Sequence, residues 1–165
     1  MKYEHQKDLQ KETKKRVERM RKEFVKPPLL KAFRNEGYDQ IIAQVHIPIS
    51  SLCEHHLVSF EGEANIAYIP NGWLIGLSKL GRVAEYYLNP SKPTIQERAT
   101  HQILQHLKTH LKPRGLMVVI RAKHTCISYR GVKKPSLTIT SAVDGLFADP
   151  LKGARQEFLQ LISNQ

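Results

Sequence analysis

The feature that most restricts the fold is a change of apolar spacing along the chain, from a period of two to a helical period and back. Residues 41–69 contain two runs in which apolar and polar residues alternate, the pattern of half-buried strands. Over residues 77–111 the spacing becomes helical, with a proline-containing break at 89–93. Runs rich in Val, Ile and Thr at 116–126 and 137–143 predict two more strands. The predicted order is two strands, two helices and two strands.

The first alternating run predicts one apolar face for a single strand. That face contains Ile41, Ala43, Val45, Ile47 and Ile49. The second run ends at Pro70-Asn71-Gly72, a turn signal, so the two strands should pair antiparallel. These patterns predict an α+β fold: an antiparallel four-stranded sheet in ββααββ order, with two helices on one face and a polar opposite face. Because such a sheet has two free edges, we expect a homo-oligomer.

Each end of the chain carries a further predicted helix. Residues 4–25 place a thin apolar stripe among basic and acidic residues, formed by Val17, Met20 and Phe24. Pro27-Pro28 ends that helix, so we divide the chain into a basic helix with its linker, residues 1–38, and a domain of residues 39–165. Near the C-terminus Asp149 is expected to cap a helix that begins at Pro150. Its buried side should hold Leu151, Phe158, Leu159 and Ile162.

Composition narrows the class of protein. The chain has 165 residues, 41% of them hydrophobic and 25% charged, which suits one globular domain. No run approaches the roughly 18 apolar residues of a membrane span, and no signal peptide is visible, so we expect a cytoplasmic protein without a membrane partner. The formal charge of +11 favours an anionic partner. Nucleic acid is disfavoured, because the basic residues have no aromatic stacking platform among them.

Cysteine and histidine concentrate in two short segments, Cys53-Glu54-His55-His56 and His124-Thr125-Cys126. Thiolate with imidazole is a zinc-type ligand set. A Cys and a His three residues apart on a tight turn can converge on one ion, which suggests Cys53, His56 and Cys126 as ligands. Three protein ligands leave a position open for water, as at a catalytic zinc, and would leave His55 and His124 available as acid and base.

The spacing of these residues leaves other sites open. Two buried free cysteines beside surface histidines would give the same pattern. A closed structural zinc site with a spare histidine as fourth ligand would also fit. The ligand set further permits iron(II) or another divalent ion.

Further segments extend the pattern along the chain: Cys53–Val58, Gly76–Leu80, Gln96–Arg98, His124–Cys126, Arg130–Val132, Thr140–Ser141 and Gly145–Phe147. In this order and at similar separations, over about residues 39–163, they resemble the GTP cyclohydrolase I family. The resemblance implies that the domain has the T-fold and is catalytic. It also implies a homo-oligomer, which we expect to be a toroidal decamer with active sites shared between subunits.

The resemblance also implies a reaction. It predicts zinc-dependent hydrolysis of GTP at C8, release of formate and rearrangement to 7,8-dihydroneopterin triphosphate, the first step of pterin and folate-type biosynthesis. One zinc ion per subunit would be held by Cys53, His56 and Cys126, and water activated by it would add at C8. His124 would protonate the purine at N7. His55 would assist beside the ribose, and Ser78 would lie near the ribose and phosphates.

Substrate contacts are implied in the same way. Glu97 would select guanine, since one carboxylate can accept from both N1–H and the exocyclic amine, and Gln96 would support it. Taken alone, Glu97 also fits an exposed first turn of a helix. The predicted triphosphate contacts are Lys79, Arg82 and Arg130. Three alternatives stay open: a noncatalytic purine-binding protein on the same fold, a cyclohydrolase that stops after ring opening, and one that acts on a related purine triphosphate.

Overall fold

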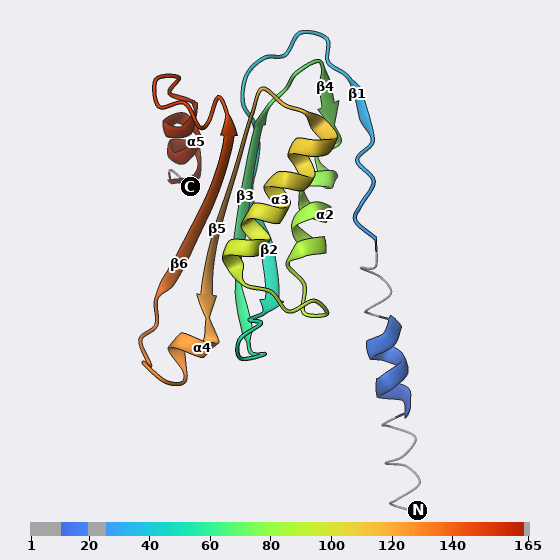
Figure 1. The fold of residues 1–165 in the computed structure, drawn as a ribbon, viewed down its shortest axis with the longest axis vertical. Coiled ribbons are helices and arrows are strands. Elements are labelled where there is room, and N and C mark those ends of the chain that lie inside the picture. The colour runs from blue at the N-terminus through green and yellow to red at the C-terminus, as the bar shows by residue number, and fades with distance from the viewer. Residues whose placement is uncertain (1–10, 20–25, 164–165) are drawn as a thin grey trace, which may run out of the picture.

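A four-stranded antiparallel sheet in the order β2-β3-β5-β6 forms the centre of the molecule (Figure 1). The structure, a computed structural model, describes residues 11–19 and 26–163. The strands of this sheet are β2 (Ile42–Leu52), β3 (Ser59–Ile69), β5 (Gly115–His124) and β6 (Leu137–Gly145). A smaller sheet pairs β1 (Ala32–Arg34) with β4 (Trp73–Ile75). The helices are α2 (Ser78–Tyr87), α3 (Gln96–Leu111), the single turn α4 (Thr125–Ser128) and α5 (Ala154–Ser163).

Helices α2 and α3 pack on one face of the sheet and form the main core with it. The helical spacing read from the sequence supplies the buried side of each helix, with Leu80 and Ala84 on α2 and Ile103 and Leu107 on α3. Fully buried residues of β3 and β5, such as Phe60 and Ile120, face them. The α+β class, the antiparallel four-stranded sheet and the ββααββ order of its main elements are confirmed.

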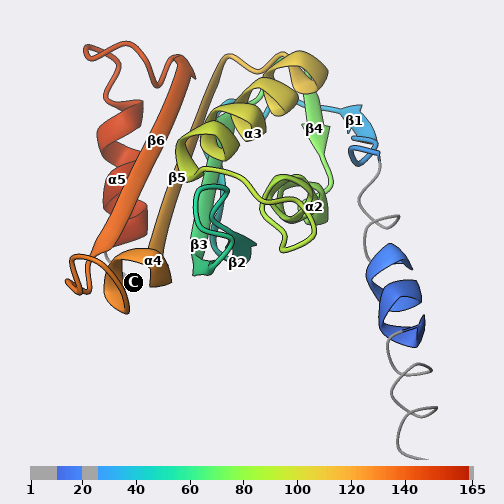
Figure 2. The same ribbon diagram turned by 60° about the horizontal axis from the view of Figure 1, so that its bottom comes forward.

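The opposite face of the sheet is partly apolar, so the prediction of a polar face was wrong there. Helix α5 lies on the side of β6 away from α2 and α3 (Figure 2). A second buried cluster joins this helix to the sheet through Met117, Val119, Phe147, Phe158 and Ile162. The reason is that β3 ends in a continuous buried run and β5 begins with one. Such runs supply buried residues to both faces of the sheet.

Strand β2 contains a bulge that the apolar alternation concealed. Its register with β3 shifts between Gln44 and Ile47, and His46 has a positive φ of 53°. An additional residue in one strand inverts the faces beyond it. Of the five residues predicted to share a face, the three before the bulge pack with the α5 cluster and the two after it pack in the main core. The single apolar face predicted for residues 41–49 was therefore wrong.

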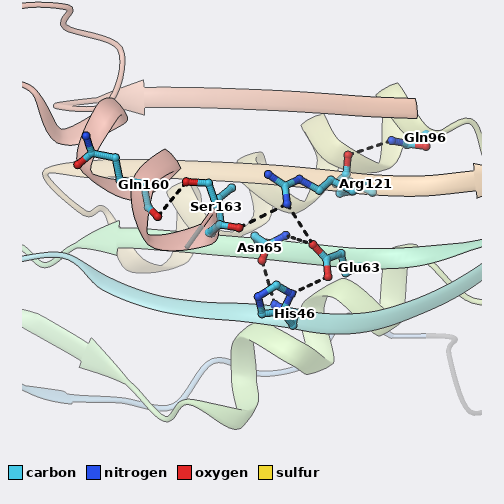
Figure 3. Close-up of polar contacts among 9 residues, drawn as sticks. His46, Glu63, Asn65, Gln96, Arg121, Gln160 and Ser163 are labelled. Atoms are coloured by element: carbon cyan, nitrogen blue, oxygen red, sulfur yellow. Dashed lines mark hydrogen bonds and ion pairs between the residues drawn. The ribbon is translucent and has the colours of Figure 1, made fainter. Parts of the chain in front are cut away.

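Polar side chains on the α5 side of the sheet hold the bulge in place (Figure 3). The backbone N–H of His46 donates to Asn65 Oδ1 at 2.9 Å, and the His46 ring donates from Nδ1 to Glu63 Oε2 at 2.6 Å. Arg121 on β5 lies 3.7 Å from Glu63 Oε1 and donates to the carbonyl of Ile162 at 3.4 Å. Burial alone would raise the pKa of Glu63, but these hydrogen bonds and charges together hold it below its usual value.

The N-terminal region agrees with the predictions in part. Residues 11–19 are helical, and Val17 is 42% exposed, whereas Met20 and Phe24 lie outside the described residues. Residues 32–34 were expected to be linker and instead form β1, because β4 offers them a pairing partner. The boundary between residues 38 and 39 stays a prediction.

Helix α5 begins later than predicted. Asp149 Oδ1 accepts from the backbone N–H of Leu151 at 2.9 Å, which closes a short turn instead of capping a helix. Gly153, with a φ of +73°, then sets the chain direction before the helix begins at Ala154. Phe158 and Ile162 are buried as predicted, while Leu151 and Leu159 are exposed. None of the helices in the described part of the chain is long and apolar enough to span a membrane.

Candidate metal and substrate site

The carboxyl ends of β2 and β5 and the start of α3 meet at one end of the sheet, beside α4 (Figure 1). Antiparallel pairing through β3 brings the two strand ends together, since Leu52 pairs with Ser59 and Phe60 pairs with His124. Cysteine and histidine segments that are far apart in the sequence therefore occupy neighbouring positions.

The segment after β2 is a tight turn. The backbone N–H of Leu57 donates to the carbonyl of Cys53 at 2.7 Å, and the N–H of Cys53 donates to the carbonyl of Val58 at 2.9 Å. Thr94, just before α3, donates to the carbonyl of Leu52 at 2.9 Å and accepts from the N–H of Glu54 at 3.0 Å. An ion pair between Glu54 and Arg98 adds a side-chain link. The turn is thus joined to the start of α3.

Cys53, His56 and Cys126 bring three metal-type donor atoms together, all within 4.8 Å of one another. Among the described residues, no other group of three or more His, Cys, Asp or Glu donors is close enough to hold an ion. Burial, and then the neighbouring Cys53 thiol, raise the pKa of Cys126. A cation between two thiolates would relieve that repulsion, so the donor set fits zinc.

His55 and His56 are adjacent but play different geometric parts. Cys53 Sγ lies 3.9 Å from His55 Nδ1 and 4.0 Å from His56 Nδ1, and the two rings meet edge to face at 68°. Of the two, only His56 belongs to the group of three donors. His55 lines the cavity beside that group.

A cavity of about 270 Å³ opens beside the three donors. The residues singled out from the sequence that line it are Cys53, His55, His56, Gln96, Glu97, His124 and Cys126. Apolar Ile95 and Ile127 complete its wall together with Thr138. The cavity therefore joins a candidate metal site, two further histidines and one carboxylate, a combination suited to acid–base chemistry on a bound ring.

His124 is held in the cavity wall by two contacts. Its ring stacks on Phe60 with centroids 4.6 Å apart, and Nε2 lies 2.7 Å from Gln96 Oε1. Burial lowers the pKa of His124, and the negative charge of Glu97 partly opposes that effect. The buried imidazole is therefore held toward its neutral form, in which one ring nitrogen is free to accept a proton.

Gln96 was expected to support Glu97, yet its side chain is only 1% exposed and faces the sheet. The two hydrogens of Nε2 are shared among three acceptors, the carbonyls of Ile120 and Thr138 at 3.1 and 3.2 Å and Thr140 Oγ1 at 3.1 Å. Sequence reasoning assigned no role to Phe60, Thr138 or Thr140. Of these, only Thr140 carried a signal, since it lies in one of the motifs quoted above.

Four predicted substrate residues do not line this cavity. Ser78, Lys79 and Arg82 lie on the first turns of α2, which starts beside β4, away from the end of the sheet that carries α4 (Figure 1). Arg130 follows α4, is exposed, and lies near enough for its charge to oppose the rise in the pKa of Cys126. One chain thus gathers the metal donors and Glu97 but leaves the three α2 residues apart.

Comparison with known proteins gives a consistent result. A sequence model of the family described as GTP cyclohydrolase I matches residues 1–163. GTP cyclohydrolase 1 of Carboxydothermus hydrogenoformans is 45% identical over 163 residues, covering 94% of this chain and 83% of its own. GTP cyclohydrolase 1 of Aquifex aeolicus is 44% identical over 156 residues, covering 92% and 83%. Among solved structures, the archaeosine synthase QueF-Like in the apo form aligns over 66% of this chain and 96% of its own, with 14% identity and a TM-score of 0.45.

Proposed function

Since the chain belongs to the GTP cyclohydrolase I family, we propose that it hydrolyses GTP at C8 with the help of zinc, releases formate and forms 7,8-dihydroneopterin triphosphate. It is an enzyme of that family, with GTP cyclohydrolase activity in pterin or folate biosynthesis. The observation that carries the finer proposal is the single cavity that joins three metal donors, two further histidines and Glu97.

Zinc is the proposed metal, with Cys53, His56 and Cys126 as its ligands and one ion per chain. When bound, it supplies a Lewis acid that activates water as a nucleophile near neutral pH. The turn at Cys53 and the strand end before Cys126 bring the donors close to one another. Cys53 is 5% exposed, so part of the donor set is already shielded from solvent.

Proton transfer is the proposed task of His124, with His55 as a second group. Protonation of the purine at N7 makes C8 electrophilic, so that water adds there and the imidazole ring of GTP opens. A second water then releases C8 as formate. His55 lines the same cavity and is proposed to assist that hydrolysis and the later rearrangement of the ribose and closure of the new ring.

Guanine selection is the proposed role of Glu97, whose side chain lines the cavity from the first turn of α3. Its carboxylate only accepts hydrogen bonds, whereas guanine offers two adjacent donors, N1–H and the exocyclic amine. Adenine has neither an N1–H nor an amine at C2, so on that edge it would leave both carboxylate oxygens without a donor. A base held there would present its five-membered ring to the histidines and the metal donors.

The triphosphate is proposed to bind Lys79, Arg82 and Arg130, with Ser78 near the ribose. Because the α2 residues do not line the cavity of their own chain, we propose that they serve the cavity of a neighbouring copy. This arrangement requires a homo-oligomer with shared sites, and a toroidal decamer is the form that we propose. Cytoplasmic location and the absence of a nucleic-acid partner stay predictions.

The products formed from GTP test the proposal directly. Purified protein with measured metal content is incubated with GTP, and formate is quantified together with neopterin after oxidation of the pterin product. Formate and neopterin in equal amounts are expected. Formate, or an opened ring, without neopterin would show that the reaction stops early, while neither product from metal-loaded protein would contradict the proposed function.

A further inference from the structure

The orientation of the Gln96 amide is fixed by groups that cannot donate a hydrogen bond. Its Nε2 lies 3.1 Å from the carbonyl oxygen of Ile120 and 3.2 Å from that of Thr138 (Figure 3 draws one hydrogen bond of Gln96). Backbone carbonyls only accept, so the NH₂ end of the amide must face them. The oxygen end, Oε1, therefore faces His124.

The same reasoning determines which ring nitrogen of His124 carries a proton. Oε1 of an amide only accepts, and it lies 2.7 Å from His124 Nε2, so Nε2 must be the N–H. In the neutral imidazole the lone pair then resides on Nδ1. Stacking on Phe60, with ring planes 11° apart, fixes the plane of the imidazole. The tautomer and the orientation of His124 are thus both set by neighbouring groups.

Two threonine hydroxyls hold Gln96 in turn. Thr100 Oγ1 lies 2.8 Å from the backbone carbonyl of Gln96 and must donate to it, which uses the only proton of that hydroxyl. Thr140 Oγ1 lies 2.7 Å from Thr100 Oγ1 and must therefore donate in that pair. Its oxygen is then the acceptor for Gln96 Nε2 at 3.1 Å. Each hydrogen bond in this closed set has one possible direction.

We propose that Gln96, held by Thr100 and Thr140, is a positioning residue that fixes the tautomer of His124, so that Nδ1 is the nitrogen that exchanges protons with the substrate. The Nδ1 proton of the imidazolium passes to N7 of the purine, and the ring returns to its neutral Nε2–H form with Gln96 still as acceptor. The amide hydrogens of Gln96 are used within the protein and do not serve the guanine base. This inference rests on the proposed function, since it takes His124 as the acid–base group.

Kinetics of Gln96→Leu separate positioning from substrate binding. Loss of the amide should lower kcat about 100-fold, the lower end of what a positioned acid–base group contributes. The KM for GTP should stay within about twofold of the wild-type value. When chemistry is slow, KM approaches the dissociation constant of GTP, and this substitution removes no contact to the base. Metal content should equal that of the wild type. A KM that rises as much as kcat falls, or an unchanged kcat, would overturn the proposal.

If Gln96→Leu folds poorly, a matched pair of variants at Thr140 tests the same hydrogen bonds that hold Gln96. Thr140→Val keeps the shape but removes the hydroxyl, and kcat should fall about 10-fold, less than for direct loss of the amide. Thr140→Ser keeps the hydroxyl and should recover most of that loss. Thr109→Val, an exposed threonine of α3, is the control that should match the wild type.

The outcomes distinguish this inference from the function on which it rests. A wild type that makes no product from GTP contradicts both. An active wild type in which Thr140→Val and Thr140→Ser have the same kcat contradicts the positioning role alone. An active wild type with reduced kcat, unchanged KM and unchanged metal content in Gln96→Leu supports it.

Discussion

The predicted site has two halves, one at the cavity end of the sheet and one on the first turns of α2. Within one chain, the residues of the first half lie together and those of the second half lie apart from them. At the cavity end, three strands and the start of α3 bring seven predicted residues to one cavity. On α2, Ser78 and Arg82 are exposed and Lys79 is half-buried, and none of the three lines that cavity. Under the proposed function, metal binding and base recognition belong to one chain, while the triphosphate requires a second copy.

The largest effect should come from removing a metal donor at the cavity end. Cys126→Ala leaves two donors, so it should lose the metal and all measurable turnover. His101→Ala, which changes an exposed histidine outside the cavity, is the control and should keep both. Metal analysis and formate release are measured on each protein. Full activity in Cys126→Ala without bound metal would remove the metal site from the cavity.

The second effect concerns the cations on α2. Lys79→Ala with Arg82→Ala should raise the KM for GTP by at least about 100-fold, since two charged contacts worth about 1.5–3 kcal/mol each are lost. Metal content should not change, because neither residue is near the donors. Steady-state kinetics and metal analysis on the same preparation are the measurements. If the KM stayed unchanged, α2 would have no part in the site and the comparison would fail.

Removing the predicted base contact at the cavity end should weaken GTP binding to a similar extent. Glu97→Ala should weaken GTP binding about 10- to 100-fold, because two donors of the base lose a charged acceptor, and should leave metal content intact. Glu97→Gln, which keeps the shape but offers a single acceptor oxygen, should fall between the wild type and Glu97→Ala. Loss of metal in Glu97→Ala would mean that this carboxylate belongs to the metal group instead.

The stability of the fold in acid should depend on Glu63, which belongs to neither half of the site. The pKa of Glu63 lies below its ordinary value of 4.5 in the folded protein, so its hydrogen bonds with His46 and Asn65 stabilise the fold above that pH, and this contribution is lost as the pH falls through the folded-state pKa. Glu63→Gln should lower the free energy of unfolding at pH 6 by about 0.5–1 kcal/mol, with the difference vanishing in acid. Urea unfolding at both pH values measures it; an unchanged difference in acid would contradict the assignment.

The smallest effect concerns the stability of the fold and is expected from replacing a glycine in α2 with alanine. At Gly81 an added Cβ would meet Ile47 at 3.9 Å and Gln44 at 4.0 Å, ordinary contacts, so Gly81→Ala should stabilise the protein by about 0.5–1 kcal/mol. At Gly62 an added Cβ would meet the carbonyl oxygen of Arg121 at 1.9 Å, so Gly62→Ala should destabilise it. Thermal unfolding of the two variants should shift in opposite directions, and a shift in the same direction would contradict these packing distances.

Local patterns were sufficient to predict much of the fold. Period-two and helical spacing gave the sheet, α2 and α3, because each pattern reports one buried face. The bulge at His46 was not predictable in this way, since it depends on Asn65, which lies 19 residues away. The start of α5 was misplaced because Asp149 suits a turn as well as a cap, and the choice depends on Gly153.

The candidate site was predictable in its residue types and less so in its contacts. Cys53, His56 and Cys126 stood out because thiols and imidazoles are few and their spacing suits a metal. The contact between Gln96 and His124 joins α3 to the end of β5 and depends on strand pairing, which no local motif encodes. Likewise, the separation of Arg82 from the cavity is visible only once α2 is placed.

Mixing a variant of the metal half with a variant of the phosphate half tests most directly whether the cavity and α2 are halves of one shared site. Cys126→Ala lacks the metal half, and the variant with Lys79→Ala and Arg82→Ala lacks the phosphate half. If copies share sites, oligomers assembled from equal amounts should regain about a quarter of the wild-type formate release at subsaturating GTP, because that share of sites combines an intact cavity with an intact α2. Activity no higher than the sum of the two variants alone would contradict a shared site.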